Sequence, residues 1–164
     1  MNTVIKNKRA VSPVIATVIL VAVAITVAVA VAYWMGGIAG MYTKFEKVEI
    51  LSAYAPKDAT SGYWNVTLLL KNTGSADATL LDAYVNNVPK TSWTPNILWY
   101  NITGGTAYSI TSDGLTLKSG QSCTLRMDIS TTCTSPTTLT SGTTINIKLH
   151  SAGGMDYIKL VEIT

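Results

Sequence analysis

The chain has 164 residues, of which 48% are apolar and 13% are charged, about half the charged fraction of an ordinary soluble domain. No charged residue lies between Ala10 and Thr43, which excludes a plain soluble globule. The abundance of Val, Ile, Leu and Tyr after this segment excludes intrinsic disorder.

The formal net charge of +3 comes entirely from Lys6, Lys8 and Arg9, because the residues after Ala10 balance nine basic against nine acidic side chains. Binding of nucleic acid needs a clustered basic face. We therefore do not expect nucleic acid as a main partner.

The uncharged segment predicts one long helix. Val14–Met35 is interrupted by Thr17 and Thr26 alone, and a helix of that length spans about 33 Å, enough to cross a bilayer core of about 30 Å. Strict alternation over residues 21–32 also fits a strand, but a strand of that length would be exceptional. The basic residues Lys6, Lys8 and Arg9 lie directly before the span. Since basic residues stay on the cytoplasmic side of a membrane span, the N-terminus is predicted to lie in the cytoplasm.

The predicted helix also carries small residues four positions apart, at Ala24, Ala28 and Ala32. Small residues at this spacing let helix backbones approach closely. The spacing fits packing between helices, and it fits a lone anchor rich in Ala and Val equally well.

These features together resemble the N-terminal region of archaeal type IV pilins. The resemblance covers residues 6–37 and lies in the basic leader, in Arg9-Ala10-Val11-Ser12-Pro13-Val14-Ile15-Ala16-Thr17, and in the helix end Tyr33-Trp34-Met35-Gly36-Gly37. It implies a class III signal peptide, residues 1–10, cut between Ala10 and Val11 by a prepilin peptidase.

The resemblance further implies that residues 11–37 first span the cytoplasmic membrane and then pack with copies of the chain in a filament core. Residues 38–43 would form a hinge. The expected function is a structural subunit of a surface filament used in adhesion, with an assembly ATPase and a membrane platform as partners. Bacterial type IV pilins usually carry Glu where this chain has Ile15, so an assembly step that needs that carboxylate is not implied.

Two alternatives remain open at this point. Archaellins, the subunits of archaeal motility filaments, share the architecture, although Gly-rich sequence usually follows their cleavage site and Val11-Ser12-Pro13 does not match it. A single-pass cell-surface protein that never polymerises and presents its outer domain to a ligand is the other alternative.

Residues 44–164 predict an extracellular all-β domain, which makes the chain α+β. Two-residue periodicity and turn signals mark the expected strands; these are 45–54, 63–71, 79–85, 115–117, 122–130, 143–150 and 156–163. Their number and spacing favour an antiparallel sandwich of immunoglobulin type. Residues 88–114 are ambiguous: Trp93 and Trp99 either pack in the core, which we favour, or form an exposed aromatic loop.

Two kinds of covalent modification are predicted for this outer domain. Cys123 and Cys133 are the only cysteines, and outside the cell such a pair favours a disulfide over two free thiols. Asn65 and Asn101 begin N-glycosylation sequons, and Asn101 is preferred because it falls in an expected loop.

No catalytic or cofactor motif emerges from the sequence. There is no Gly-x-Ser-x-Gly, no phosphate loop and no Cys/His arrangement, and His150 is the single histidine. The carboxylates show no metal-ligand spacing. We therefore expect no enzyme, no metal and no cofactor.

Overall fold

A computed structural model describes residues 13–134 and 136–164. They divide into a helical unit that ends at Thr43 and a β domain, Lys44–Thr164. The expected leader, residues 1–10, and the expected cleavage site between Ala10 and Val11 lie outside the described residues.

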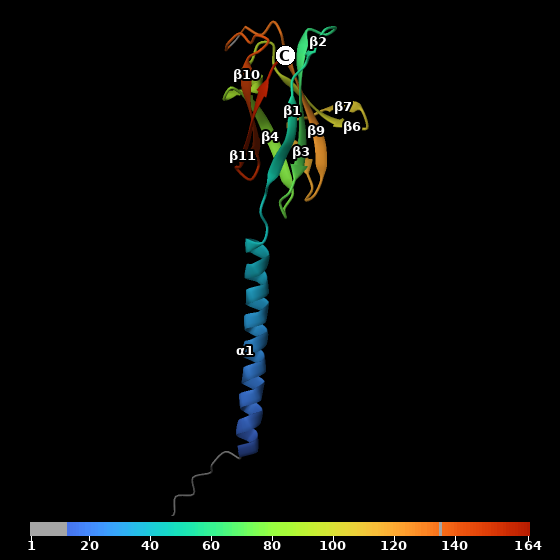
Figure 1. Ribbon diagram of the computed structural model, residues 1–164. Helices are drawn as coiled ribbons and strands as arrows, with labels where there is room; N and C mark the ends of the chain where they lie inside the picture. The colour runs from blue at the N-terminus through green and yellow to red at the C-terminus, as the bar shows by residue number, and fades with distance from the viewer. Residues whose placement is uncertain (1–12, 135) are drawn as a thin grey trace, which may run out of the picture. The chain divides into compact units, whose positions relative to one another are not determined.

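The helical unit is one continuous helix, α1 (Pro13–Tyr42) (Figure 1). The helix passes through three glycines and ends at Tyr42, five residues beyond residue 37. The prediction of a hinge over residues 38–43 was therefore wrong for residues 38–42, which are helical. None of Gly36, Gly37 and Gly40 has the positive φ that ends a helix. A helical glycine costs about 1 kcal/mol relative to alanine, but it does not by itself stop the helix.

The β domain consists of two sheets, and their strands pair antiparallel. The first sheet has the order β1-β3-β9-β6-β7, with β2 also on β3; its strands are β1 (Val48–Tyr54), β2 (Lys57–Asp58), β3 (Tyr63–Asn72), β6 (Leu98–Thr103), β7 (Thr106–Ser109) and β9 (Ser122–Ser130). The second sheet has the order β11-β10-β4-β5, with β8 also on β4; its strands are β4 (Ala78–Val85), β5 (Val88–Pro89), β8 (Leu115–Leu117), β10 (Thr144–Ser151) and β11 (Asp156–Glu162).

The core lies between these sheets and follows the period of two in the sequence. Alternate side chains of β3, β9 and β10 are buried; they are Trp64, Val66, Leu68, Leu70, Leu125, Met127, Ile129, Ile145, Ile147 and Leu149. The predicted α+β class, a helix followed by an antiparallel sandwich, is confirmed.

The ambiguous region 88–114 contains more structure than the sequence predicts: β5, a 3₁₀ turn (Lys90–Ser92), β6 and β7. Trp93 and Trp99 are 0% and 4% exposed, which confirms core packing over an exposed aromatic loop. The turn Gly104-Gly105 joins β6 to β7, and both glycines have positive φ, as a two-residue hairpin turn requires.

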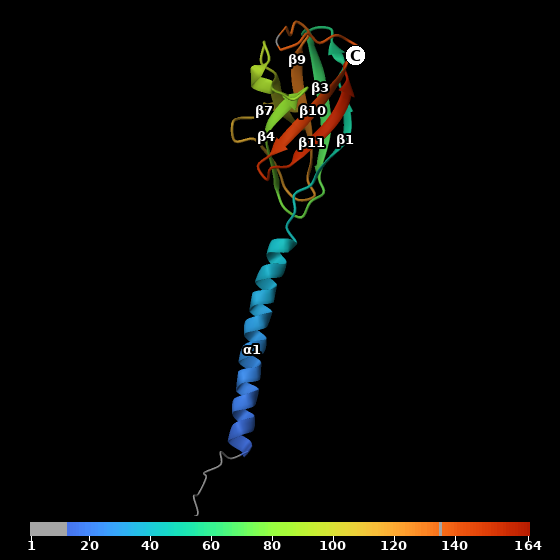
Figure 2. The same ribbon diagram turned by 90° about the vertical axis from the view of Figure 1, so that its left-hand side faces the viewer.

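One side of the sandwich is closed by β1 and β11, which lie next to each other in Figure 2. Ala55 and Ile163 form a parallel bridge. Just beyond it, the Thr164 N–H donates to the Ala55 carbonyl at 3.1 Å, and the Lys57 N–H donates to the Thr164 carbonyl at 2.8 Å. These bonds join the edges of the two sheets at this corner.

The first residues of the β domain are held by the turn between β3 and β4. The Ala76 N–H donates to the Phe45 carbonyl at 3.1 Å, and the Thr73 N–H donates to the Lys47 carbonyl at 2.8 Å. A Cβ on Gly74 would lie 2.5 Å from the Phe45 carbonyl oxygen, so only glycine allows this close approach. From Phe45 onward, the backbone is therefore hydrogen-bonded to the turn between β3 and β4.

Candidate assembly surface

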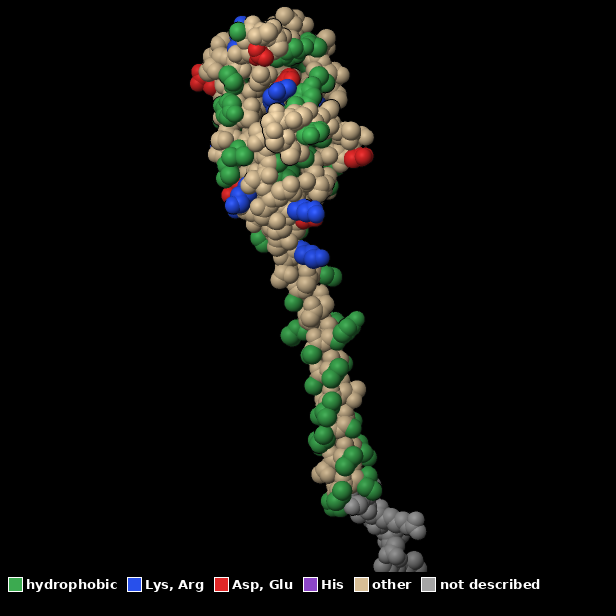
Figure 3. Space-filling model, turned by 90° about the vertical axis from the view of Figure 1, so that its right-hand side faces the viewer, with side chains coloured by type: hydrophobic (Ala, Val, Ile, Leu, Met, Phe, Trp, Pro, Cys, Tyr) green, Lys and Arg blue, Asp and Glu red, His purple; other side chains and the backbone are tan. Residues whose placement is uncertain are grey.

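The surface of α1 is entirely apolar in character. None of its 30 residues carries a charge and none is buried, and Figure 3 shows hydrophobic side chains along the length of the helix in view. An isolated helix that is hydrophobic on all sides is not stable facing water. This surface therefore requires a lipid environment or other apolar helices around it.

The helix has the dimensions of a membrane span. Among the described residues, α1 alone is long and apolar enough to cross a bilayer, with a mean hydropathy of 3.0 in its most apolar window. Val14–Ala32 covers about 28 Å at 1.5 Å per residue. Tyr33 and Trp34 follow, 87% and 66% exposed, and amphipathic aromatic rings favour the membrane–water interface.

The two threonines within the span do not make the surface polar. The Thr17 hydroxyl donates to the Val14 carbonyl and the Thr26 hydroxyl donates to the Ala22 carbonyl, each at 2.8 Å. Because each hydroxyl proton is bonded within the helix, neither threonine needs an external hydrogen-bond acceptor in an apolar environment.

The row of small residues is longer than the three alanines predicted from the sequence. Since α1 continues to Tyr42, Gly36 and Gly40 extend the row of Ala24, Ala28 and Ala32 at the same spacing of four. A Cβ added to either glycine would meet nothing within 4 Å, so no contact within the described chain requires glycine there. Close approach of another helix is the physical role that such a row fits.

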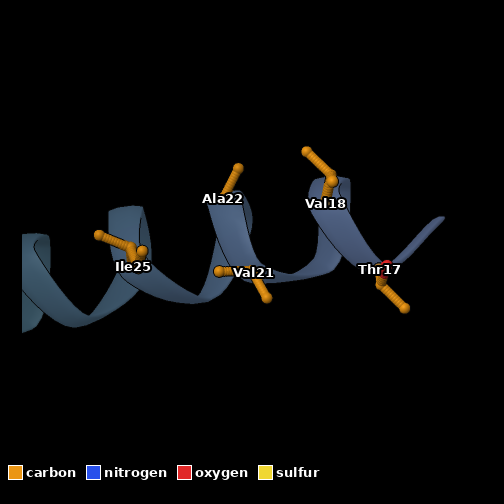
Figure 4. Close-up of a pocket in the computed structure, with 5 residues that line it drawn as sticks. All are labelled: Thr17, Val18, Val21, Ala22 and Ile25. Atoms are coloured by element: carbon orange, nitrogen blue, oxygen red, sulfur yellow. The ribbon is translucent and has the colours of Figure 1, made fainter. Parts of the chain in front are cut away.

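A shallow hollow lies near the start of the helix, lined by Thr17, Val18, Val21, Ala22 and Ile25. In Figure 4, Val18 and Ala22 project to one side of the ribbon, and Thr17 and Val21 project to the other. All five side chains come from the same helix, which cannot enclose a ligand alone. The hollow is therefore an open part of the apolar surface of α1.

Both cysteines are free thiols, so the predicted disulfide between Cys123 and Cys133 was wrong. Cys123 lies near the start of β9 and Cys133 lies three residues past its end. The strand carries the chain about 23 Å from Cys123 to Ser130, and three residues can return at most about 11 Å. The Cα atoms of the two cysteines are therefore at least about 12 Å apart, whereas a disulfide needs Cα atoms within about 7 Å.

The environment of these thiols predicts low reactivity in the folded chain. Burial raises the pKa of Cys123 to about 11 and also raises the pKa of Cys133. Since only the thiolate is nucleophilic, we expect iodoacetamide at pH 8 to modify neither cysteine in the folded chain. In guanidinium without reductant it should modify both. Intact-mass measurement checks this, and a denatured chain that needs reductant before it reacts would contradict the free-thiol assignment.

The two sequon asparagines lie in strands of the first sheet, so the expectation that Asn101 occupies a loop was wrong. Asn101 is in β6 opposite Leu125, on the core-facing side, and its Oδ1 is buried without a partner. Asn65 is in β3 opposite Asp128, on the outer face. Asn65 is therefore the better placed acceptor, and glycosylation of either residue stays a prediction.

The single histidine lies within hydrogen-bond distance of an aspartate on the second sheet. His150 in β10 lies with Nδ1 2.6 Å from Oδ1 of Asp156 in β11, and Lys148 Nζ lies 3.7 Å from Oδ2 of Asp156. The hydrogen bond from His150 is the main cause that lowers the pKa of Asp156. Within residues 13–134 and 136–164, no three His, Cys, Asp or Glu side chains gather as a metal site would require.

Comparison with known proteins finds similarity to solved structures. No protein-family model matches the chain, and no curated protein matches it. The archaellum periplasmic stator protein FlaG from Sulfolobus acidocaldarius is similar in structure, with 14% identity and a TM-score of 0.37, over 71% of this chain and 99% of that chain.

Proposed function

We propose that this chain is the structural subunit of an archaeal type IV pilus-like surface filament used in adhesion. The precursor lies in the cytoplasmic membrane with its N-terminus inside, a prepilin peptidase cuts it between Ala10 and Val11, and α1 then polymerises. The observation that carries the proposal is a helix of 30 residues that has no charge and no buried residue, preceded by the leader that resembles those of archaeal pilins.

The chemistry of α1 supports both stages of this life cycle. In the membrane, its apolar length and the Tyr33-Trp34 pair suit a single span with the β domain outside. In the filament, copies of α1 supply the apolar surroundings that the lipid supplied before. The row from Ala24 to Gly40 lets neighbouring helices approach closely.

The charge balance supports the same sequence of events. Removal of residues 1–10 removes the whole formal net charge and leaves nine basic and nine acidic side chains. Subunits of zero net charge do not repel one another at long range. The leader thus determines the topology, and its removal produces a subunit suited to close packing with many copies. An assembly ATPase and a membrane platform are the partners that the proposal requires.

The N-terminus and intact mass of protein sheared from native cells test the proposal. A chain that begins at Val11 in the sheared fraction is the expected result, and mass in excess of the polypeptide would measure attached glycan. Protein that retains Met1 and remains with the membranes would contradict it. That outcome would favour the alternative of an anchored surface protein that does not polymerise.

A further inference from the structure

The edge of the first sheet at β7 differs from the other sheet edges of the β domain. Edge strands are usually protected by charged residues or proline, since unpaired backbone groups invite pairing with another chain. β11 carries Asp156, Lys159 and Glu162, β5 contains Pro89, and β1 contains Glu49 and is joined to β11. β8 is flanked by Asp113 and Lys118.

β7 has none of these protections. No charged residue occurs over the 22 residues 91–112, and β7 contains no proline and pairs with β6 without a bulge. All four of its residues are exposed, and no second strand of the described chain pairs with it. In Figure 1 the β6–β7 hairpin lies at the margin of the domain.

The register of the hairpin shows which backbone groups face this open edge. The Ile110 N–H donates to the Trp99 carbonyl at 3.2 Å, and Tyr108 lies opposite Asn101. Because hydrogen-bonded and non-hydrogen-bonded pairs alternate in an antiparallel ladder, Tyr108 bonds to β6, whereas Ala107 and Ser109 do not. The N–H and C=O groups of Ala107 and Ser109 therefore point outward.

We infer that β7 pairs with β7 of a second copy of the chain. The two strands run antiparallel and are related by a two-fold axis that passes between the two Tyr108 residues. In this register Ala107 lies opposite Ser109 of the other copy, and the two residues exchange backbone hydrogen bonds. Two such pairs give about four hydrogen bonds. The Tyr108 side chains of the two copies meet as a non-hydrogen-bonded aromatic pair, which adds cross-strand stabilisation.

A second copy is the occupant that the charges favour. Residues 44–164 carry nine basic and nine acidic side chains, so two β domains do not repel at long range, and the uncharged edge brings no like charges together. The contact is short and therefore weak, and it needs copies concentrated by a shared membrane or filament. It does not depend on whether the helices polymerise.

Cysteine cross-linking in membranes tests this register. Non-hydrogen-bonded pairs have Cα atoms about 4.5 Å apart, within the range of a disulfide. The full chain with Tyr108→Cys, reconstituted in phosphatidylcholine vesicles and mildly oxidised, should give at least fivefold more disulfide dimer than Thr106→Cys. The latter is a matched control on the same strand face. The wild-type chain controls for Cys123 and Cys133.

A change at Ala107 separates backbone pairing from mere proximity. Ala107→Pro removes an outward N–H without removing a bond to β6, and in the Tyr108→Cys background it should reduce the dimer at least fivefold. Ala107→Thr keeps the N–H and should leave the dimer unchanged. Near-ultraviolet circular dichroism confirms that each variant is folded. Equal cross-linking at positions 106 and 108, no dimer at 108, or a folded Ala107→Pro chain that still cross-links would overturn the inference.

Discussion

Replacing Ala28 with aspartate is expected to abolish filament assembly while the β domain remains folded. Ala28 lies in the middle of α1, and no charged side chain within the helix can pair with the new carboxylate. An unpaired charge at the centre of an apolar span costs about 3 kcal/mol on insertion scales. The cost recurs in every subunit, so electron micrographs of cells that express only this variant should show no filaments.

Two further variants of Ala28 separate membrane insertion from packing. Ala28→Ser retains a small uncharged side chain and should assemble normally. Ala28→Leu should insert into the membrane at wild-type level, but its bulk prevents close approach at the row of small residues, so we expect few filaments. Immunoblots of the membrane fraction measure insertion in each case. Normal filaments from Ala28→Asp cells would contradict a role for α1 in the filament core.

Gly114→Ala is expected to destabilise the β domain far more than Gly120→Ala. Both glycines have positive φ, +81° at Gly114 and +78° at Gly120, but their surroundings differ. A Cβ at position 114 would lie 2.3 Å from the Leu80 carbonyl oxygen of β4, whereas a Cβ at position 120 would meet nothing within 4 Å. Gly120→Ala therefore incurs only the backbone penalty of about 1–2 kcal/mol.

The backbone of β4 cannot move away from a new Cβ at position 114 without disturbing its pairing with β8, where Leu80 lies opposite Leu115. We expect a total loss of at least ~3 kcal/mol for Gly114→Ala. For a domain of this size each 1 kcal/mol lowers Tm by about 4 °C. Thermal unfolding of the full chain, followed by near-ultraviolet circular dichroism of the buried tryptophans, measures both losses. Equal Tm values for the two variants would contradict the close approach.

The correct and incorrect sequence predictions differ in how far apart the interacting residues lie. Alternation in β3, β9 and β10 is a local pattern, and it located these strands because one face of each is buried against the core. β6 has a weaker pattern, and its place in the sheet depends on pairing with β9, more than 20 residues later in the chain. The location of Asn101 in a strand, with its side chain toward the core, follows from that pairing and from no local signal.

The cysteines illustrate the same distinction. The sequence correctly placed Cys123 on the face of β9 shared with Leu125, Met127 and Ile129. It did not exclude a bond to Cys133. Two cysteines ten residues apart can touch if the chain between them turns, but they cannot touch if it is an extended strand. The length of β9 decides this, and β9 extends to Ser130 because β3 pairs with it over nine consecutive residues.

By itself, the sequence determined the apolar helix, the separation of the chain into two unlike parts, the balance of charge after Ala10 and most strands of the sandwich. These follow from composition and short-range periodicity, which act within a few residues. The tertiary structure decided which sheet edges are closed, which backbone groups of β7 remain open and why a Cβ at position 114 would collide with Leu80. Each of these depends on strands distant in the chain that meet through hydrogen bonds and close contact, and no local pattern encodes such meetings.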